Sequence, residues 1–112
     1  MKIVLIGPPA SGKSSVGRRL AALMQTSFVD SDAKISEIEG RSVSEIFVDS
    51  GEAYFREIES NVVLDLLETA SGVISLGGGS ILDQKVCAKI REIKEGNLVV
   101  FLDVSLNQAS SR

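Results

Sequence analysis

The sequence predicts an α/β domain in which a parallel β-sheet carries helices on both faces. Short apolar stretches alternate with segments of helical periodicity along the chain, as expected for β-α-β units. A glycine-rich loop joins the first apolar stretch directly to the first helix. No repeat, low-complexity segment or internal linker interrupts the sequence. We therefore expect residues 1–112 to form a single domain.

Composition excludes several classes of protein. An apolar content of 44% with 24% charged residues is typical of a soluble globular chain. The chain has no histidine and one cysteine, Cys87, which excludes an intramolecular disulfide, a His/Cys metal site and a histidine-based triad. No signal peptide or membrane-length apolar run is seen. We expect a cytoplasmic monomer without membrane contact.

Charge is distributed unevenly, although the net charge is only −3. The first 25 residues contain Lys2, Lys13, Arg18 and Arg19 and no acidic residue, whereas residues 26–70 are strongly acidic. No long basic surface is available for phosphate contacts, so nucleic acid is not an expected partner. The basic residues lie beside the glycine-rich loop.

The glycine-rich loop, residues 7–14, reads G-x-x-x-x-G-K-S and matches the phosphate-binding P-loop. Glycines let backbone amides approach a phosphate, and the following helix N-terminus adds favourable dipoles. Lys13 would sit near the β- and γ-phosphates, and the Ser14 hydroxyl would ligate Mg²⁺. Prolines at two loop positions remove donors, so later amides should hold the phosphates. The expected ATP contacts are Ala10, Ser11, Gly12, Lys13, Ser14 and Ser15.

Periodicity and capping signals define the elements of the first half. Residues 2–6 suit a buried parallel strand. Large apolar residues then recur at helical spacing, and Ser42 and Glu45 form a capping box before another helix. The expected elements are a strand at 2–6, a helix at 13–25 with an apolar stripe of Val16, Leu20, Leu23 and Met24, a strand at 27–29, a helix at 33–39 ended by Gly40, and a helix from 43 to about 49.

The second half begins with a longer helix that should pack on a sheet face. Its stripe contains Phe55, Ile58, Val62 and Leu66. Asp83 is expected to cap the next helix, on which Cys87 is a small core residue rather than a nucleophile. The expected elements are helix 52–70, strand 73–76, a helix from Asp83 to Gly96 with Val86, Cys87, Ile90 and Ile93 inward, a fully buried strand at 98–102, and a helix from residue 105.

Three strand ends carry unusual residues, and ligands bind at the carboxyl ends of strands in open α/β sheets. Besides the P-loop, these are Asp30 with Asp32, and Gly77–Gly79. In extended backbone the two carboxylates would point the same way, suiting Mg²⁺ and a substrate hydroxyl, but Asp32 could equally be a helix N-cap. The glycine triplet indicates backbone close to a ligand, with a flexible loop as the alternative. Arg56 could simply form an exposed pair with Glu59.

Together these motifs resemble the shikimate kinase family. The resemblance rests on the P-loop, Asp30-Ser31-Asp32, the segment Gly51-Glu52-x-x-Phe55-Arg56, and the run 75–79, in this order and spacing. It implies a P-loop kinase fold with a five-stranded sheet of order 2-3-1-4-5. It also implies transfer of the γ-phosphoryl group of ATP to the 3-hydroxyl of shikimate, in the route to aromatic amino acids.

The resemblance implies a role for each matching position. ATP and shikimate would be the partners and Mg²⁺ the cofactor. Lys13 and Asp32 would be catalytic, with Asp32 orienting the attacking hydroxyl. Ser14 would ligate the Mg²⁺ ion and Asp30 would hold its water shell, and Arg112 would lie against the adenine ring. The expected shikimate site contains Asp32, Arg56, Gly77, Gly78, Gly79, Glu59, Phe47 and Phe55, with Arg56 on the carboxylate.

The chain is shorter than the shikimate kinases that it resembles. A lid, a second carboxylate-binding arginine and the fifth strand are expected beyond Arg112, so residues 1–112 alone should be a poor kinase. The sequence could equally be part of a longer active enzyme. An absent fifth strand would also expose one edge of strand 98–102 and favour self-association.

Two other functions remain open on the sequence. One is a P-loop kinase for another small metabolite such as gluconate, or for a nucleoside monophosphate. The acidic character of residues 26–70 disfavours a phosphorylated acceptor. The other is a non-catalytic ATP-binding module, which would need neither Asp32 nor Arg56.

Overall fold

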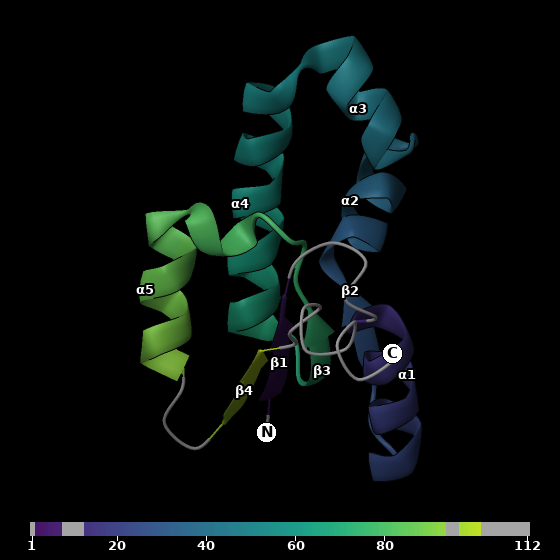
Figure 1. Cartoon of the computed structure of the whole chain (residues 1–112), viewed down its shortest axis with the longest axis vertical. Helices are drawn as coiled ribbons and strands as arrows, with labels where there is room; N and C mark the ends of the chain where they lie inside the picture. The colour runs from purple at the N-terminus through teal and green to yellow at the C-terminus, as the bar shows by residue number, and fades with distance from the viewer. Residues whose placement is uncertain (1, 8–12, 94–96, 102–112) are drawn as a thin grey trace, which may run out of the picture.

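The computed structural model describes residues 2–7, 13–93 and 97–101, and within them four parallel strands form one sheet. Figure 1 shows the strands grouped below a taller helical part of the molecule. The strand order is β2-β3-β1-β4, which confirms the predicted parallel sheet and agrees with the expected family order. The strands are β1 (Lys2–Ile6), β2 (Phe28–Asp30), β3 (Gly72–Ser75) and β4 (Leu98–Phe101).

Helices cover both faces of the sheet, as predicted. Alternate residues of β1 point to opposite faces, so Leu5 packs towards α1 (Lys13–Met24), while Val4 packs towards α4 and α5. Val4 and Leu5 are at most 1% exposed. Burial of one such side chain contributes about 1.5–3 kcal/mol. The two helices on the second face are α4 (Glu52–Thr69) and α5 (Gln84–Ile93).

A helical arm extends beyond the sheet; we define it as α2 (Ser31–Glu39), α3 (Val43–Ser50) and the first half of α4, residues 52–60. It has its own small core, formed by Ile35, Ile46 and Phe55. Gly40 in the left-handed conformation ends α2, and the predicted capping box between Ser42 and Glu45 begins α3. The sharp α2–α3 and α3–α4 connections therefore bring three helices around one apolar centre.

A polar cluster ties the two ends of α3 together. Arg41 donates hydrogen bonds to Glu39 Oε1 (3.0 Å) and Ser50 Oγ (2.9 Å). The Tyr54 hydroxyl donates to the same Glu39 oxygen at 3.1 Å, and the Arg41 guanidinium lies 5.7 Å from the Tyr54 ring centre. Glu39 also raises the pKa of Arg41. The cluster fixes the outer end of the arm against α4.

Two predicted features near β2 are wrong. β2 includes Asp30, and α2 begins at Ser31 rather than Ala33, so Asp30 and Asp32 do not share an extended segment. The N-cap of α2 is Asp30, whose Oδ2 accepts a hydrogen bond from Ala33 N at 3.2 Å. Asp32 lies in the first turn of the helix instead. The strand's last residue thus also starts the helix, which periodicity alone could not reveal.

Of the predicted apolar stripe of α1, only Leu20 packs against the sheet, where it is partly buried. Val16 is 43% exposed and Leu23 is 77% exposed. The helix approaches the sheet through small residues instead, because a Cβ at Gly17 would overlap the Phe28 ring and lie 3.1 Å from Leu5. Ala21, one turn later, is buried in the same cluster. Close helix–sheet packing requires small residues at Gly17 and Ala21, so most of the large residues of α1 fall outside the contact.

Other predictions fail near the second half of the sheet. β4 is not fully buried, since Leu98 is 47% exposed on what is the edge strand of the described sheet. β3 begins one residue earlier than expected, at Gly72, and a 3₁₀ helix at Ser80–Leu82 follows the glycines. Cys87 is only partly buried. The expected helix from residue 105 lies outside the described residues, among which no helix is long and apolar enough to span a membrane.

Gly72 provides a test of this packing. Its φ is +82°, and a Cβ would lie 2.6 Å from the Ser27 carbonyl oxygen, which already accepts a hydrogen bond from Val73 N at 2.9 Å. Left-handed strain and the clash should make Gly72→Ala cost about 3 kcal/mol. Gly40→Ala is the matched control, because its φ is +70° but nothing lies within 4 Å, so only about 1 kcal/mol is expected. Urea unfolding of both variants measures the difference; equal losses would contradict the clash.

Asp83 gives a pH-dependent test. The Ser60 hydroxyl and the amides of Lys85 and Val86 hydrogen-bond to this carboxylate and hold its pKa below the ordinary value. Asp83 therefore stabilises the fold above its ordinary pKa, and this contribution is lost as pH falls through the lowered value. Ser60→Ala should raise the Asp83 pKa in a carbon-detected NMR titration. The lowered pKa of Glu45, set by Ser42, should not change in this variant.

Candidate functional site

The predicted clusters lie together at the carboxyl ends of the parallel strands. β2 ends at Asp30 and β3 ends at Ser75, and these two residues are partners in register. The chain leaves β3 alongside β1, with Leu76 N donating to Leu5 O at 3.0 Å. In open α/β sheets, ligands bind just outside these carboxyl ends. Residues 8–12, the Lys13 side chain and Arg112 lie outside what the structure describes.

Gly77 lies where two acidic side chains meet the backbone. A Cβ at this position would be 2.6 Å from Asp32 Oδ1 and 2.9 Å from Glu59 Oε2. Both carboxylate oxygens are therefore within 3 Å of one point, and no side chain other than hydrogen fits there. Asp32 comes from α2 and Glu59 from α4, so the glycine permits two helices to bring carboxylates to the same place. The groups that approach the Gly77 backbone here are protein side chains, and its predicted contact with a ligand stays a prediction.

The first turn of α2 is connected directly to this loop. Gly77 N donates a buried hydrogen bond to Ser31 Oγ at 2.9 Å, across 46 residues of sequence. Ser31 is 0% exposed. This hydrogen bond joins the helical turn that carries Asp32 to the Gly77 backbone, which both Asp32 and Glu59 approach.

Arg56 lies beside the carboxylates, one helical turn before Glu59. Its Nη1 is 2.9 Å from Glu59 Oε1, and its Nη2 is 3.7 Å from Glu52 Oε2. The predicted pair with Glu59 is present, but it is not an ordinary exposed pair, because Glu59 is only 4% exposed. The Arg56 side chain remains 39% exposed. A buried acid thus orients a guanidinium that still faces solvent.

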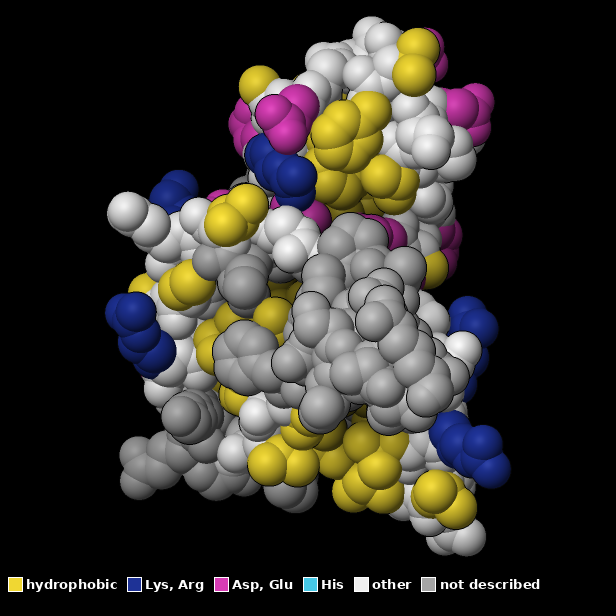
Figure 2. Space-filling model, in the orientation of Figure 1, with side chains coloured by type: hydrophobic (Ala, Val, Ile, Leu, Met, Phe, Trp, Pro, Cys, Tyr) yellow, Lys and Arg dark blue, Asp and Glu magenta, His cyan; other side chains and the backbone are white. Residues whose placement is uncertain are grey.

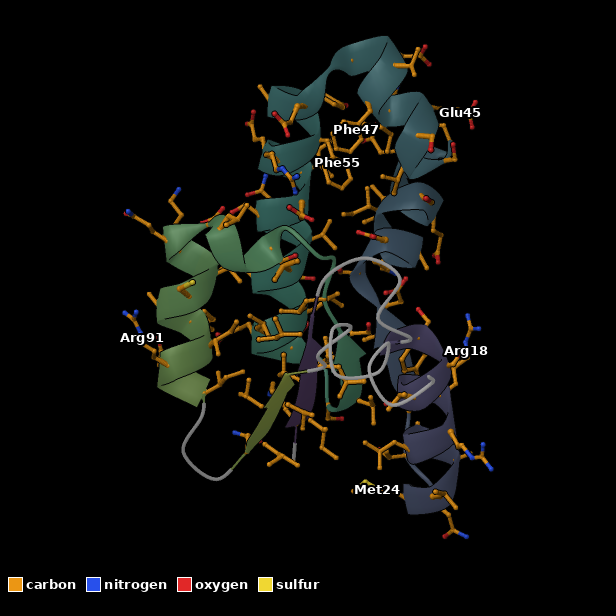
Figure 3. The ribbon with its side chains drawn as sticks, in the orientation of Figure 1. Arg18, Met24, Glu45, Phe47, Phe55 and Arg91 are labelled. Atoms are coloured by element: carbon orange, nitrogen blue, oxygen red, sulfur yellow. The ribbon has the colours of Figure 1, made fainter. Side chains whose placement is uncertain are left out.

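Aromatic rings and a second glycine complete the surroundings of Arg56. Figure 3 shows Phe47 and Phe55 pointing towards one another from α3 and α4, and their ring centres are 4.6 Å apart. The Arg56 guanidinium lies 5.5 Å from the Phe55 ring centre and 6.0 Å from that of Phe47. A Cβ at Gly79 would overlap the guanidinium, coming within 2.9 Å of Cζ. The loop backbone therefore passes directly against the arginine.

The surface around these residues combines an arginine with carboxylates and apolar side chains. Figure 2 shows hydrophobic side chains between α3 and α4, with basic and acidic side chains next to them. A pocket of about 330 Å³ borders Arg56 on the side of the 3₁₀ helix. It is lined by Glu52, Arg56, Glu59, Gly79, Leu82 and Asp83. Cation, carboxylates and rings thus share one small region.

Most predicted acceptor-site residues come together, and four contributors were missed: Ser31, Glu52, Leu82 and Asp83. Asp32, Glu59 and Gly77 form one group, and Arg56, Gly79 and the two phenylalanines adjoin it through Glu59. The second carboxylate on Arg56, at Glu52, could have been recognised from its i,i+4 spacing. Nothing in the sequence marked the Ser31 bond or the pocket residue Leu82.

The metal-site prediction concerns Ser14 and Asp30. Among the described residues, no group of three or more Asp, Glu, His or Cys side chains could hold a metal by itself. Asp30 provides one capping oxygen to Ala33, which leaves its second carboxylate oxygen for other interactions.

Comparison with known proteins identifies the family. A family model described as shikimate kinase matches residues 9–112. A shikimate kinase of Rhodococcus erythropolis is 46% identical over 99% of this chain and 63% of its own length. The shikimate kinase of Acinetobacter baumannii, solved in complex with shikimate, has a TM-score of 0.79 and 36% identity over 90% of this chain and 55% of that one.

A further structure supports the same assignment. Shikimate kinase from Aquifex aeolicus has a TM-score of 0.79 and 40% identity, and covers 92% of this chain and 60% of its own. The chain thus spans about three fifths of the length of the relatives that it matches. The matched region contains both the arm and the sheet described above. The chain belongs to the shikimate kinase family.

Proposed function

We propose that this chain provides the acceptor site and nucleotide cradle for ATP-dependent phosphorylation of the 3-hydroxyl of shikimate. The observation that carries the proposal is the arrangement of Arg56, which the buried Glu59 orients against the backbone of Gly79. Shikimate has one carboxylate and several hydroxyls on an apolar ring, and this site offers a partner for each. The related enzyme from Acinetobacter baumannii was solved with shikimate.

Arg56 is the proposed anchor for the shikimate carboxylate. A guanidinium can donate two parallel hydrogen bonds to a carboxylate, which fixes both position and orientation. To bind the carboxylate, Arg56 would give up its longer contact, with Glu52 at 3.7 Å, and keep its shorter one, with Glu59 at 2.9 Å. The rings of Phe47 and Phe55 would border the substrate carbon skeleton.

Asp32 is the proposed partner of the reacting hydroxyl. Asp32 lies in the first turn of α2, directly after β2, and its carboxylate lies against Gly77. A carboxylate there can accept a hydrogen bond from the hydroxyl, orient it, and accept its proton as the bond to phosphorus forms. Backbone groups of residues 77–79 would contact the other hydroxyls.

The nucleotide side is proposed from the P-loop and the start of α1. Amides of Ala10 to Ser15 would hold the phosphates, Lys13 would neutralise charge on the transferred group, and Arg112 would lie against adenine. Ser14 and Asp30 would hold Mg²⁺ and its water shell. When bound, the ion would neutralise developing charge on the phosphate oxygens.

Shikimate titration tests the acceptor site directly. Calorimetry should detect saturable shikimate binding to the wild-type chain, and Arg56→Ala should weaken it about 100-fold, because two charge-assisted hydrogen bonds are lost. Arg56→Lys keeps the charge but loses the planar fork, so a loss of about tenfold is expected. Arg91→Ala, an exposed arginine on α5 far from the arm in Figure 3, is the control.

The outcomes distinguish the functions. Shikimate-dependent ADP release in the protein that carries this chain would establish the kinase. Nucleotide binding without any shikimate binding would favour the non-catalytic module. Gluconate binding in place of shikimate would favour the other metabolite kinase. Equal shikimate affinity in wild type and Arg56→Ala would contradict the role of Arg56.

A further inference from the structure

We propose that Ser31 is a positioning residue of the acceptor site. Its hydroxyl fixes the backbone of Gly77 and thereby the gap between the Asp32 and Glu59 carboxylates. The inference rests on the proposed function, since that gap matters only if shikimate binds there. Ser31 itself would touch neither substrate nor nucleotide.

The hydrogen bond from Gly77 N to Ser31 Oγ is the first step. Ser31 is completely buried, and the bond of 2.9 Å joins it to the loop that follows β3. Removing the acceptor would leave a buried N–H without a partner, which is costly, so the loop would shift to recover one. The hydroxyl therefore determines where the Gly77 backbone rests.

The position of Gly77 determines the geometry of the two acids. Its missing Cβ marks a point within 3 Å of both Asp32 Oδ1 and Glu59 Oε2. Glu59 is held from the other side by Arg56. Asp32 follows Ser31 directly in the same helical turn. Ser31 is therefore linked to Asp32 through the chain and, through its hydrogen bond, to the Gly77 backbone that both carboxylates approach. Movement of Gly77 would change where Asp32 and Glu59 meet the substrate.

Ser80 supplies a matched control in the same loop. It is also 0% exposed, and its Oγ has no hydrogen-bond partner among the described residues. Its backbone N donates to Gly77 O at 3.0 Å, which substitution by alanine preserves. Ser80→Ala thus removes a buried hydroxyl close to Gly77 without removing a bond to it. No change in shikimate affinity is expected.

The experiment compares Ser31→Ala, Ser31→Thr and Ser80→Ala at a temperature at which circular dichroism shows each to be folded. In Ser31→Ala, amide exchange at Gly77 should be about tenfold faster and shikimate affinity about tenfold lower, with ATP affinity within about twofold of wild type. Ser31→Thr keeps the hydroxyl and should restore both readouts. Ser80→Ala should match wild type. The selective loss for shikimate separates positioning from general destabilisation.

Three results would overturn the inference. Folded Ser31→Ala with wild-type shikimate affinity would show that the bond does not position the site. Equal losses for shikimate and ATP would indicate general destabilisation. If Ser31→Ala does not fold, Ser31→Thr provides the test. Slow amide exchange at Gly77 together with a loss of shikimate affinity in Ser31→Thr would contradict the inference. A wild-type chain that binds no shikimate contradicts the proposed function instead, whatever Gly77 exchange shows.

Discussion

The absence of side chains at Gly77 and Gly79 is the constraint on which the site depends. At Gly77 two carboxylates from different helices reach the same point of the backbone, and at Gly79 the Arg56 guanidinium does so. Like charges brought this close need compensation, and Arg56 supplies it through Glu59. A methyl group at either glycine would force an ionic side chain to move. The loop after β3 is therefore a surface against which charged groups are positioned.

Helix α4 connects this surface to the fold. Its C-terminal half packs Val63 and Leu67, both 0% exposed, against the sheet. Its N-terminal half carries Arg56 and Glu59 and joins the core of the arm through Phe55. Because a single continuous helix spans both regions, the stability of the sheet core also holds the charged pair in place. The polar cluster around Arg41 restrains the outer end of the same helix.

Much of the fold followed from periodic patterns and capping residues. The parallel sheet and the capping box at Ser42 were predicted, because the alternation of strands with helices and the capping residues are local signals. The apolar stripe of α4 was predicted only in part, because Phe55 and Ile58 pack in the core of the arm and not on the sheet. The contact face of α1 was not predicted, since helix–sheet contact at Gly17 depends on the Phe28 ring, which comes from another element. The burial of β4 was overestimated because strand position in the sheet is a property of topology.

The candidate site was predictable to a similar degree. The family resemblance named Asp32, Arg56 and Glu59, and the structure gathers them around the glycines. Their mutual geometry was not predictable, because Asp32 was assigned to extended backbone when it lies in a helical turn. The Ser31 bond spans 46 residues and has no local signature. Their functional roles remain predictions.

The most direct test of the central claim is the shikimate affinity of Gly79→Ala, measured with its unfolding free energy. The new methyl group would displace the Arg56 guanidinium and weaken its pair with the buried Glu59, so the chain should stay folded but lose about 1–3 kcal/mol of stability. If the loop positions Arg56 for the substrate carboxylate, shikimate affinity should fall about tenfold. Unchanged shikimate affinity in a folded Gly79→Ala chain would contradict the claim that the loop after β3 positions Arg56.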